Sequence, residues 1–338
     1  MNDAVHEHRE KGKSMKIGIC YDTKENYGLD SMNMDYTDFS TYATVSDISY
    51  ALSQAGHVVG FINGLEQVKK LTEGQVEYDL VFNISEGFGS RNREGLVPSL
   101  LELYKIPFSG SDAYALSLTL NKLHTKLIAQ YLGIPTPKFV LFSDHHDIAI
   151  SELLFPLVVK PNAEGGSMGV FKVNNDSELR QRCQELFSKY GCEILCEEYI
   201  DGIEITAPVI GNGNSSRCIG VTAVQHSSGE DIEIYDSNLK YFGDIILTTD
   251  FNCPEKIKRT IMNYSEKLHK FLSLRDYSRS DFRLSKENIP YLLEVNPLPA
   301  LDRDDTFEVC GNALNLHYHE TLNMIVIAAA KRYGIINE

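Results

Sequence analysis

Hydrophobic and polar positions follow two alternating patterns in the first part of this 338-residue chain. Short apolar runs rich in β-branched residues predict buried strands, and apolar residues at helical spacing between them predict helices that pack on those strands. This repeated order of strand and helix is typical of an open parallel α/β sheet with helices on both faces. The predicted strands are 15–22, 57–62, 78–84 and 106–109, and the predicted helices are 44–52, 65–71 and 96–104.

Two segments near the start lack such a period. Residues 1–14 are polar, and we expect a disordered tail there. Residues 23–42 are rich in Asn, Asp, Ser, Tyr and Met. That composition is typical of a flexible connection or of a loop that closes over a ligand, and the sequence leaves both open.

The pattern changes after a long predicted helix at 112–132, which Ser111 can cap and which Gly133 and Pro135 end. A smaller α+β unit follows, and the chain becomes strand-rich from residue 204 up to a predicted loop at 235–251. The predicted strands of the smaller unit are 138–142, 156–160, 170–173 and 193–199, and the predicted helices beyond residue 140 are 148–153, 176–190, 255–272 and 317–333.

A glycine-rich loop at 162–169 follows a predicted strand that ends in Lys160. Its glycines let backbone N–H groups turn inward, and Ser167 adds a hydroxyl, which is how a loop binds phosphate oxygens. The loop has neither the GxxxxGK[ST] nor the GxGxxG sequence. A simple hairpin turn is the alternative, and the strand-terminal lysine favours the phosphate loop.

The stretches 277–284 and 291–296 predict two strands around a polar turn. Because side chains alternate along a strand, Arg279, Asp281 and Arg283 share one face. The second strand divides in the same way, with Leu292, Glu294 and Asn296 on one face and Tyr291, Leu293 and Val295 on the other.

If these two strands pair as a hairpin, Asp281, Glu294 and Asn296 converge with Arg279 beside them. Three hard oxygen ligands suit Mg²⁺, which keeps its remaining positions for water and phosphate oxygens. The alternative is a solvated strand face. Since this face lies between apolar runs and ends in prolines, we expect a metal site.

Three further residues are ambiguous by pattern alone. A single lysine on a helix, such as Lys122, is more often solvated than bound to a ligand. The same holds for glutamates in an acidic chain, such as Glu197 and Glu204. The two glutamates lie seven residues apart, so they face opposite sides of a continuous strand. A turn at Asp201-Gly202 is needed to bring them to one ligand, where they could accept from ribose hydroxyls or an adenine amino group.

Composition narrows the function classes. The formal net charge of −15 argues against nucleic acid or an anionic membrane as a partner. Seven cysteines are scattered without a CxxC pair, and no signal peptide or membrane-spanning run is apparent, so we expect a cytoplasmic protein. The letters of a GxSxG motif occur only in the glycine-rich loop, at 165–169, between two predicted strands and not at a strand-to-helix elbow. No HExxH motif occurs, so neither nucleophilic nor zinc-dependent catalysis is supported.

The motifs NKLHTK, VVKPNAEGGSMGV, EEYIDGIEIT and SRSDFRL…YLLEVNPLPAL occur in this order. Together with VFNISEGFGSRNREGLVPSLLELYKIPFSGSD, this combination resembles the ATP-grasp superfamily and, within it, the D-alanine–D-alanine ligase group. The resemblance covers residues 81–300 and, more loosely, 15–80. It implies an N-terminal α/β domain (15–118), a central small domain (119–200) and a C-terminal domain (201–338), with ATP between the last two.

The resemblance also assigns roles. Lys122 and Lys160 fall where the family binds ATP phosphates, and 163–169 matches its phosphate-covering loop, including Glu164, Gly165, Gly166 and Ser167. Glu197 and Glu204 match acids that contact adenine and ribose, with the backbone of Glu198 to Ile200 lining the adenine. Asp281, Glu294 and Asn296 match ligands of Mg²⁺, or Mn²⁺ in its place. Arg279 matches an arginine that steadies the tetrahedral intermediate, Lys240 and Tyr241 resemble a pair in the mobile loop, and Ser167 is a candidate to orient substrate.

The implied reaction is activation of a carboxylate by ATP to an acyl phosphate, followed by attack of an amine. The substrates are then small molecules, and the family commonly forms homodimers through its N-terminal domain. Metal ions and lysines neutralise phosphate charge, Arg279 stabilises oxyanion charge, and a closing loop excludes water.

The residues at the positions where the family binds its amino-acid substrates depart from the family pattern. The glutamate that binds the first amino acid aligns near Phe39, and the serine of the glycine loop aligns with Gly166. The serine-containing turn after Pro299 becomes 300–305, with three aspartates that repel a carboxylate unless Arg303 faces it. We therefore expect a ligase for other amino-acid or amine substrates. An authentic D-alanine–D-alanine ligase, an ATP-grasp kinase and an ATP-binding regulatory protein are the alternatives.

Overall fold

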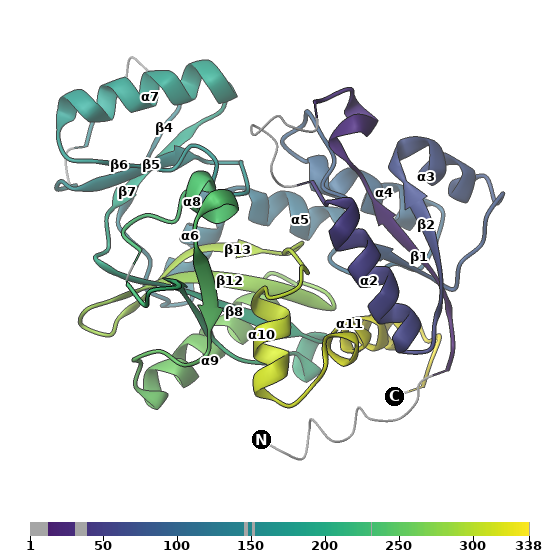
Figure 1. Ribbon diagram of the computed structural model, residues 1–338. Helices are drawn as coiled ribbons and strands as arrows, with labels where there is room; N and C mark the ends of the chain where they lie inside the picture. Colours follow the sequence, from purple (N-terminus) through teal and green to yellow (C-terminus); the bar gives the residue numbers. More distant parts are fainter. Residues whose placement is uncertain (1–12, 31–38, 145–147, 151–152, 231, 338) are drawn as a thin grey trace.

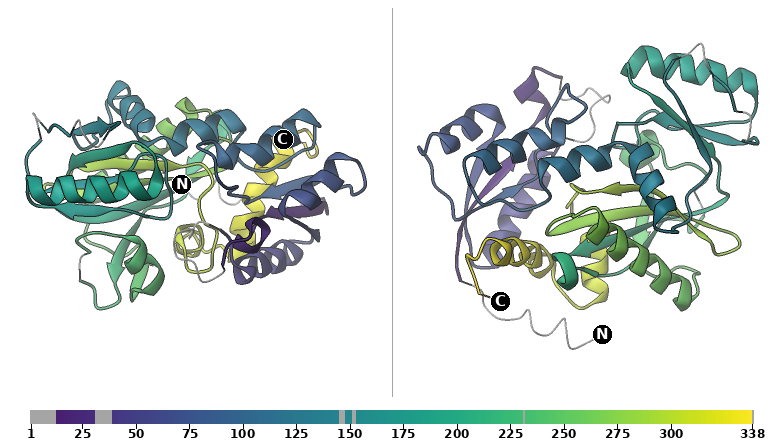
Figure 2. Two further views of the ribbon diagram at one scale, coloured as in Figure 1. Left: turned by 90° about the horizontal axis from the view of Figure 1, so that it is seen from above. Right: turned by 180° about the vertical axis from the view of Figure 1, so that it is seen from behind.

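The computed structural model describes residues 13–30, 39–144, 148–150, 153–230 and 232–337. In this part of the chain, strands form three sheets (Figure 1). A small parallel sheet near the N-terminus and a small antiparallel sheet flank a larger antiparallel sheet built from residues 202–296 (Figure 2). None of the helices in the described ranges is long and apolar enough to cross a membrane.

The N-terminal sheet has the order β2-β1-β3 and is parallel throughout, as the sequence predicted. Helices α2 and α11 cover one face, and α3 and α4 cover the other. The predicted strand at 106–109 is only a bridge between Phe108 and Val81. The elements are β1 (Lys16–Tyr21), η2 (Lys24–Tyr27), α2 (Tyr42–Gln54), β2 (Val58–Asn63), α3 (Gly64–Thr72), β3 (Leu80–Asn83), η3 (Arg93–Gly95) and α4 (Leu96–Leu103).

The single helix predicted at 112–132 is wrong, because the chain forms α5 (Ala113–Leu120) and α6 (Lys122–Tyr131). Asn121 breaks the helix with φ −82° and ψ 103°, and its side chain accepts a hydrogen bond from the backbone N–H of His124 (3.1 Å). Asparagine can satisfy a helix N-terminus in this way, so it competes with helix continuation. Lys122 therefore starts a new helix, and its N–H donates to the Asn162 carbonyl (2.9 Å).

The small antiparallel sheet has the order β4-β7-β5-β6, and α7 (Asp176–Tyr190) covers one face. The helix predicted at 148–153 is not formed by its described residues, 148–150 and 153. Ile148 and Leu153 are nevertheless buried in this core. So short a segment makes too few hydrogen bonds to offset helix nucleation. The strands are β4 (Phe139–Phe142), β5 (Leu157–Pro161), β6 (Phe171–Val173) and β7 (Ile194–Glu198).

The large sheet has the order β11-β10-β8-β12-β13, with β9 paired to β8. The predicted loop at 235–251 is wrong, because it contains α8 (Ser237–Phe242), capped by Asp236, and strand β11 (Ile245–Thr248). The other elements are β8 (Gly202–Ile210), η4 (Gly213–Ser215), β9 (Arg217–Cys218), β10 (Thr222–His226), α9 (Glu255–Phe271), β12 (Tyr277–Ser285), β13 (Pro290–Asn296), α10 (Thr306–Ala313) and α11 (Tyr318–Arg332).

The sheets fall within the three predicted ranges, and the exact domain boundaries stay a prediction. Helix α11 returns to the N-terminal unit and packs against α2 and β1, so the first and last units share a core. Arg332 at its end bonds to buried Asp276 (Nη2–Oδ2 2.6 Å) and to the Phe108 carbonyl (2.7 Å). These contacts fix the N-terminal unit against the large sheet.

Candidate active site

The hairpin of β12 and β13 pairs as predicted, but with a β-bulge. Asp281 lies opposite Glu294 and Arg279 opposite Asn296, and the register shifts so that Phe282 lies opposite Leu292. Leu293 is therefore the extra residue. Because of the bulge, Leu292 joins Val295 in the apolar core, while Glu294 and Asn296 line the cavities. The prediction that Leu292 shares a face with Glu294 and Asn296 is wrong for this reason.

Cations neutralise the two facing carboxylates. The guanidinium of Arg279 donates two hydrogen bonds to Asp281 (2.8 Å each), and Asn296 donates a third through Nδ2 (2.7 Å). Lys122 Nζ lies 3.2 Å from Glu294 Oε2. Burial disfavours the charge of Glu294, but Lys122 and Lys160 outweigh it and lower the pKa of Glu294 to about 2. Glu294 is therefore ionised at neutral pH.

The donor set fits a hard cation. Two adjacent carboxylates and the amide oxygen of Asn296 are ligands that Mg²⁺ prefers. Burial raises the pKa of Asp281, and Arg279 opposes this. In the described residues, no group of three or more His, Cys, Asp or Glu side chains is arranged to hold a metal. A metal at this hairpin would thus use two carboxylates and one amide, with other ligands from water or substrate.

The glycine loop connects β5 to β6, as expected. Gly166, Ser167 and Gly169 all have positive φ (59°, 56° and 68°), so the backbone curls. A Cβ at Gly169 would lie 2.7 Å from Leu186 Cδ2 of α7, so only glycine permits this close approach. The curled segment presents Gly165, Gly166 and Ser167 to a cavity.

Two side chains from other elements hold this loop. Lys122 of α6 contacts the Glu164 carbonyl. Arg93, from the turn before α4, donates to the Ala163 carbonyl (Nη1–O 3.2 Å) and lies 3.3 Å from the Glu164 carboxylate. The N-terminal unit therefore touches the loop directly.

Glu197 of β7 lies buried between two lysines. Its oxygens are 2.5 Å from Lys160 Nζ and 2.6 Å from Lys126 Nζ. Burial lowers the pKa of Lys126 to about 8 even though Glu197 opposes this, and the two lysines hold the pKa of Glu197 below its ordinary value despite burial. The sequence interpretation did not include Lys126. Its spacing of four residues from Lys122, which places both on one face of α6, was the available signal.

Glu204 comes from a different sheet than Glu197. Residues 199–201 belong to no strand, which supplies the break that the sequence argument required. Glu204 lies 3.6 Å from Arg283, whose guanidinium also donates to the carbonyls of Ile200 (3.2 Å) and Ile232 (2.8 Å). Burial raises the pKa of Glu204 to about 7. Arg283 thus ties the 199–201 segment to the chain beyond β10.

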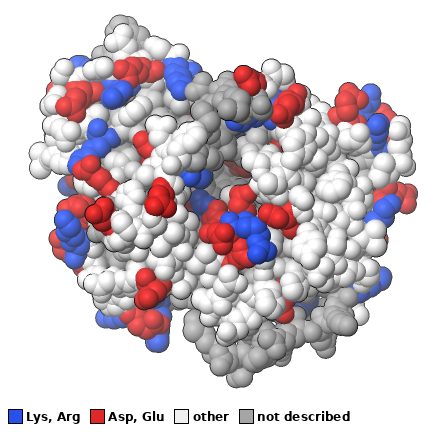
Figure 3. All heavy atoms as spheres, in the orientation of Figure 1, with Lys and Arg blue, Asp and Glu red and all other residues white. Residues whose placement is uncertain are grey.

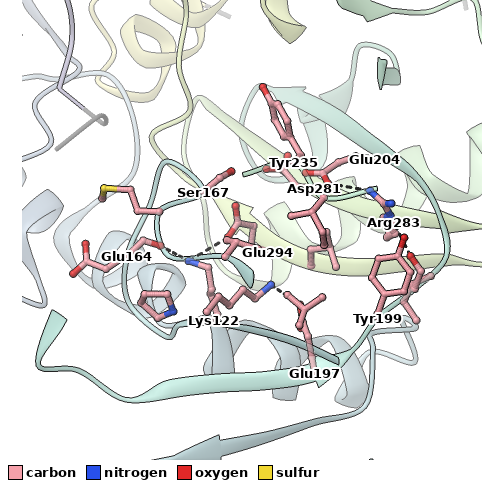
Figure 4. Close-up of a pocket in the computed structure, with 18 of the residues that line it drawn as sticks. Lys122, Glu164, Ser167, Glu197, Tyr199, Glu204, Tyr235, Asp281, Arg283 and Glu294 are labelled. Atoms are coloured by element: carbon pink, nitrogen blue, oxygen red, sulfur yellow. Dashed lines mark hydrogen bonds and ion pairs between the residues drawn. The ribbon is translucent and has the colours of Figure 1, made fainter. Parts of the chain in front are cut away.

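These elements enclose two adjoining cavities, which are called the nucleotide-side cavity and the acceptor-side cavity after the roles that the resemblance implies. Both reach Lys122, Glu204, Asp281 and Glu294, and Figure 4 shows these residues in the nucleotide-side cavity. The structure brings most predicted site residues to one or both of them. Those in the nucleotide-side cavity include Lys160, Glu164, Ser167, Glu197, Glu198 and Ile200, and those in the acceptor-side cavity include Gly165, Gly166, Lys240, Arg279 and Asn296.

Two predicted residues need separate mention. Tyr241 follows Lys240 in α8, but its side chain lies outside the described part of the structure. Phe39, where the family pattern has a glutamate, does line the acceptor-side cavity.

Known proteins match this arrangement. A family model described as D-ala D-ala ligase C-terminus matches residues 128–327, more than half of the chain. The D-alanine–D-alanine ligase of Acidovorax ebreus is 31% identical over 249 residues, which cover 72% of this chain and 73% of that protein. This chain belongs to the D-alanine–D-alanine ligase family.

Two further matches complete the comparison. The uncharacterized protein y4sG of Sinorhizobium fredii is 30% identical over 259 residues, 75% of each chain. The crystal structure of the D-alanine–D-alanine ligase from Bacillus anthracis complexed with ATP gives a TM-score of 0.74, at 24% identity over 96% of this chain and 100% of that one. At this identity the likeness shows the fold, which is the ATP-grasp fold that the sequence predicted.

Members of this family are ADP-forming ATP-grasp ligases that make carbon–nitrogen bonds, and this chain is such an ATP-dependent carboxylate–amine ligase. The kinase and regulatory alternatives are set aside. The roles assigned to individual site residues stay predictions.

Proposed function

We propose that this ligase activates a carboxylic acid with ATP and joins it to an amine other than D-alanine. The proposal rests on the acidic residues that line the acceptor-side cavity, Glu86, Glu94, Asp302 and Asp305. D-alanine–D-alanine ligation is the competing function, since relatives named for it match this chain.

We assign ATP to the nucleotide-side cavity. We assign Lys122 and Lys160 to its phosphates, the 163–169 loop to covering them, and Glu204 to the ribose. The backbone at Glu198 to Ile200 lies on the same cavity and is available for the adenine edge. Lysines at phosphate oxygens and a loop that closes over them neutralise charge and exclude water from a hydrolysable intermediate.

Asp281, Glu294 and Asn296 would hold Mg²⁺ or Mn²⁺. When bound, the metal neutralises phosphate charge and polarises the transferred phosphoryl group. Arg279 lines the acceptor-side cavity and keeps Asp281, which lines both cavities, in a fixed position. We assign Arg279 to the developing oxyanion of the acyl carbon during amine attack, because its charge stays fixed and needs no reorganisation. Lys240, Tyr241 and Ser167 are proposed to position the substrate.

The acceptor-side cavity is rich in acids, and one of them, Asp305, interacts electrostatically with Arg279. Glu86, Glu94, Asp302 and Asp305 line it. In the view of Figure 3, acidic side chains gather with a few basic ones around the hollow between the units. Asp302 is bonded to Thr44, and burial raises the pKa of Asp302.

Arg303 does not offset these acids. Its guanidinium lies 3.0 Å from Glu308 and 4.7 Å from the centre of the Tyr318 ring, and it is not among the residues that line the cavity. A free α-carboxylate beside the attacking nitrogen would be repelled by Asp302 and Asp305. An amine without that carboxylate, or with a second positive charge, fits better.

Phosphate release from ATP and Mg²⁺ tests the proposal. The enzyme is supplied with carboxylic acids, including D- and L-amino acids, and with amines that range from D-alanine to diamines, singly and in pairs, with mass detection of products. We expect turnover with a pair whose amine lacks a free carboxylate or carries an extra charge. Efficient formation of D-alanyl-D-alanine would overturn the substrate proposal and leave the ligase activity intact.

We also propose a cytoplasmic homodimer. All seven cysteines are free, which suits a reducing compartment. Exposed apolar side chains gather on α2, β2 and α3 of the N-terminal unit, where β2 is an edge strand. These are Tyr42, Tyr50, Val58, Phe61 and Leu65. Light scattering of the purified protein tests the dimer, and substitution of Phe61 by Glu should shift it to monomer.

A further inference from the structure

Lys126 is a fully buried lysine next to the nucleotide-side cavity. It lies one helical turn after Lys122 on α6, and its ammonium contacts Glu197 (2.6 Å) and the Thr136 hydroxyl (2.8 Å). The ring of Phe139 covers it at 5.5 Å. A buried ammonium is costly unless it is paired, so these contacts account for its charge.

The contact of Lys126 with Glu197 connects it to Lys160, the lysine that we assign to phosphate. Glu197 holds Lys160 at 2.5 Å as well as Lys126, so two ammonium groups share one carboxylate. With Lys126 present, the net charge of the three groups is positive, and Lys160 at the cavity wall can attract a phosphate. Without Lys126, Glu197 would cancel the charge of Lys160 and draw it away from the ligand.

The contact of Lys126 with Thr136 connects it to the hairpin of β12 and β13, which carries the proposed metal ligands. Thr136 accepts from Lys126 and donates to the Leu292 carbonyl (2.8 Å), while the Leu292 N–H donates to the Pro135 carbonyl (2.7 Å). Leu292 stands at the β-bulge, where backbone groups lose their partners in the ladder. The 135–136 segment supplies those partners, and the bulge that it holds is next to Glu294, whose side chain lines the cavity.

We propose that Lys126 is a positioning residue that couples the phosphate-side lysine, Lys160, to the metal-side carboxylate, Glu294, through Glu197 and Thr136. The inference rests on the proposed assignment of Lys160 to phosphate and Glu294 to metal. It goes beyond that assignment because Lys126 and Thr136 are not among the residues that line either cavity. They act through the residues that do.

Three variants separate the two contacts. Lys126→Met removes the charge at similar length and affects both. Thr136→Val removes only the hydroxyl at equal size, and Thr136→Ser keeps the hydroxyl. Lys267→Met is the matched control, because Lys267 donates to the Leu132 carbonyl just beyond α6 (2.7 Å) and lies on the exposed face of α9, outside both cavities.

The measurement is calorimetric titration of each full-length protein with ATP, first without divalent metal and then with Mn²⁺. We expect Thr136→Val to raise the Mn²⁺ concentration for half-saturation of the ATP complex by about 10-fold, the scale of a lost outer contact at a metal site. Its metal-free ATP dissociation constant should stay within about twofold of wild type. Lys126→Met should weaken both, and Thr136→Ser and Lys267→Met neither.

Thermal unfolding of the same proteins distinguishes coupling from simple destabilisation. A purely structural role would lower the melting temperature and would change the half-saturating Mn²⁺ concentration and the metal-free ATP dissociation constant together. If Thr136→Val leaves the Mn²⁺ requirement unchanged, or changes both constants equally, the coupling is overturned. If wild type itself binds no ATP, the nucleotide assignment fails, and the coupling that rests on it fails with it. The two Thr136 variants decide alone if Lys126→Met does not fold.

Discussion

Asp281 of β12 lies directly opposite Glu294 of β13, immediately before the β-bulge at Leu293. Each carboxylate is balanced by its own cation, Arg279 for Asp281 and Lys122 for Glu294. Two facing carboxylates repel one another, and these two cations offset part of the repulsion in so buried a place. Burial raises the pKa of Asp281, whereas Lys122 and Lys160 lower the pKa of Glu294 despite its burial. A cation bound between the two carboxylates, as proposed above, would offset the repulsion further.

Replacement of Asp281 by Asn tests the metal assignment. The variant keeps the size of the side chain and removes one negative charge, so we expect metal-dependent turnover to fall by about 10-fold or more, the scale of a lost transition-state interaction. Steady-state ADP release against Mg²⁺ concentration measures it. Asp250→Asn is the control, because Asp250 is exposed and lies outside both cavities. Equal activity of the two variants would reject the assignment.

Glu204 predicts a particular dependence of stability on pH. Burial raises its pKa from 4.5 to about 7 in the folded protein, so the folded state binds this proton more tightly than the unfolded chain does. Its contribution to stability is complete below about pH 4.5 and is lost as the pH rises through about 7. Glu204→Gln should flatten this part of the profile, measured by thermal unfolding at a series of pH values. Parallel profiles for wild type and variant would contradict the prediction.

Because Asn121 caps the helix that begins with Lys122, we expect its replacement to weaken ATP binding as well as lower stability. Asn121→Ala removes the cap of α6, which costs about 1 kcal/mol, and releases Lys122 from its place at the first residue of the helix. We expect weaker ATP binding in addition to lower stability. Asn175→Ala is the matched control, since Asn175 caps α7 in the same way (3.0 Å to Glu178 N) far from the cavities. The control should lose stability and keep ATP affinity, as measured by chemical unfolding and calorimetry.

Because Arg93 holds the glycine loop, we expect its replacement to increase hydrolysis of the activated intermediate by water. It bonds the Ala163 carbonyl and the Glu164 carboxylate, so Arg93→Gln should loosen the phosphate loop and admit water. ADP release with the carboxylate substrate but without amine should then rise several-fold, relative to coupled turnover. Arg91→Gln, an exposed neighbour, serves as control. Unchanged uncoupled hydrolysis would show that the loop closes without Arg93.

Much of the fold could be predicted because its signals are local. The apolar runs that became β1, β2 and β3 indicated a parallel sheet, and helix α7 begins and ends where its period predicted. The alternation that set Arg279, Asp281 and Arg283 on one face also held, since it depends only on the geometry of one strand. The chemistry-bearing residues were thus recognisable before their partners were known.

Other features depended on contacts between distant residues. The bulge at Leu293 reversed the face of Leu292, because register is chosen by partner strands and by the 135–136 segment. The sequence interpretation did not select Lys126, which Glu197 and Thr136 contact in the structure, and Arg303 could have faced the acceptor, but it contacts Glu308 and Tyr318 instead. The sequence by itself determined most of the elements, the alternation along β12 and the set of charged groups. Only the tertiary structure decided which charges are buried together, because burial and pairing are properties of distant segments in contact.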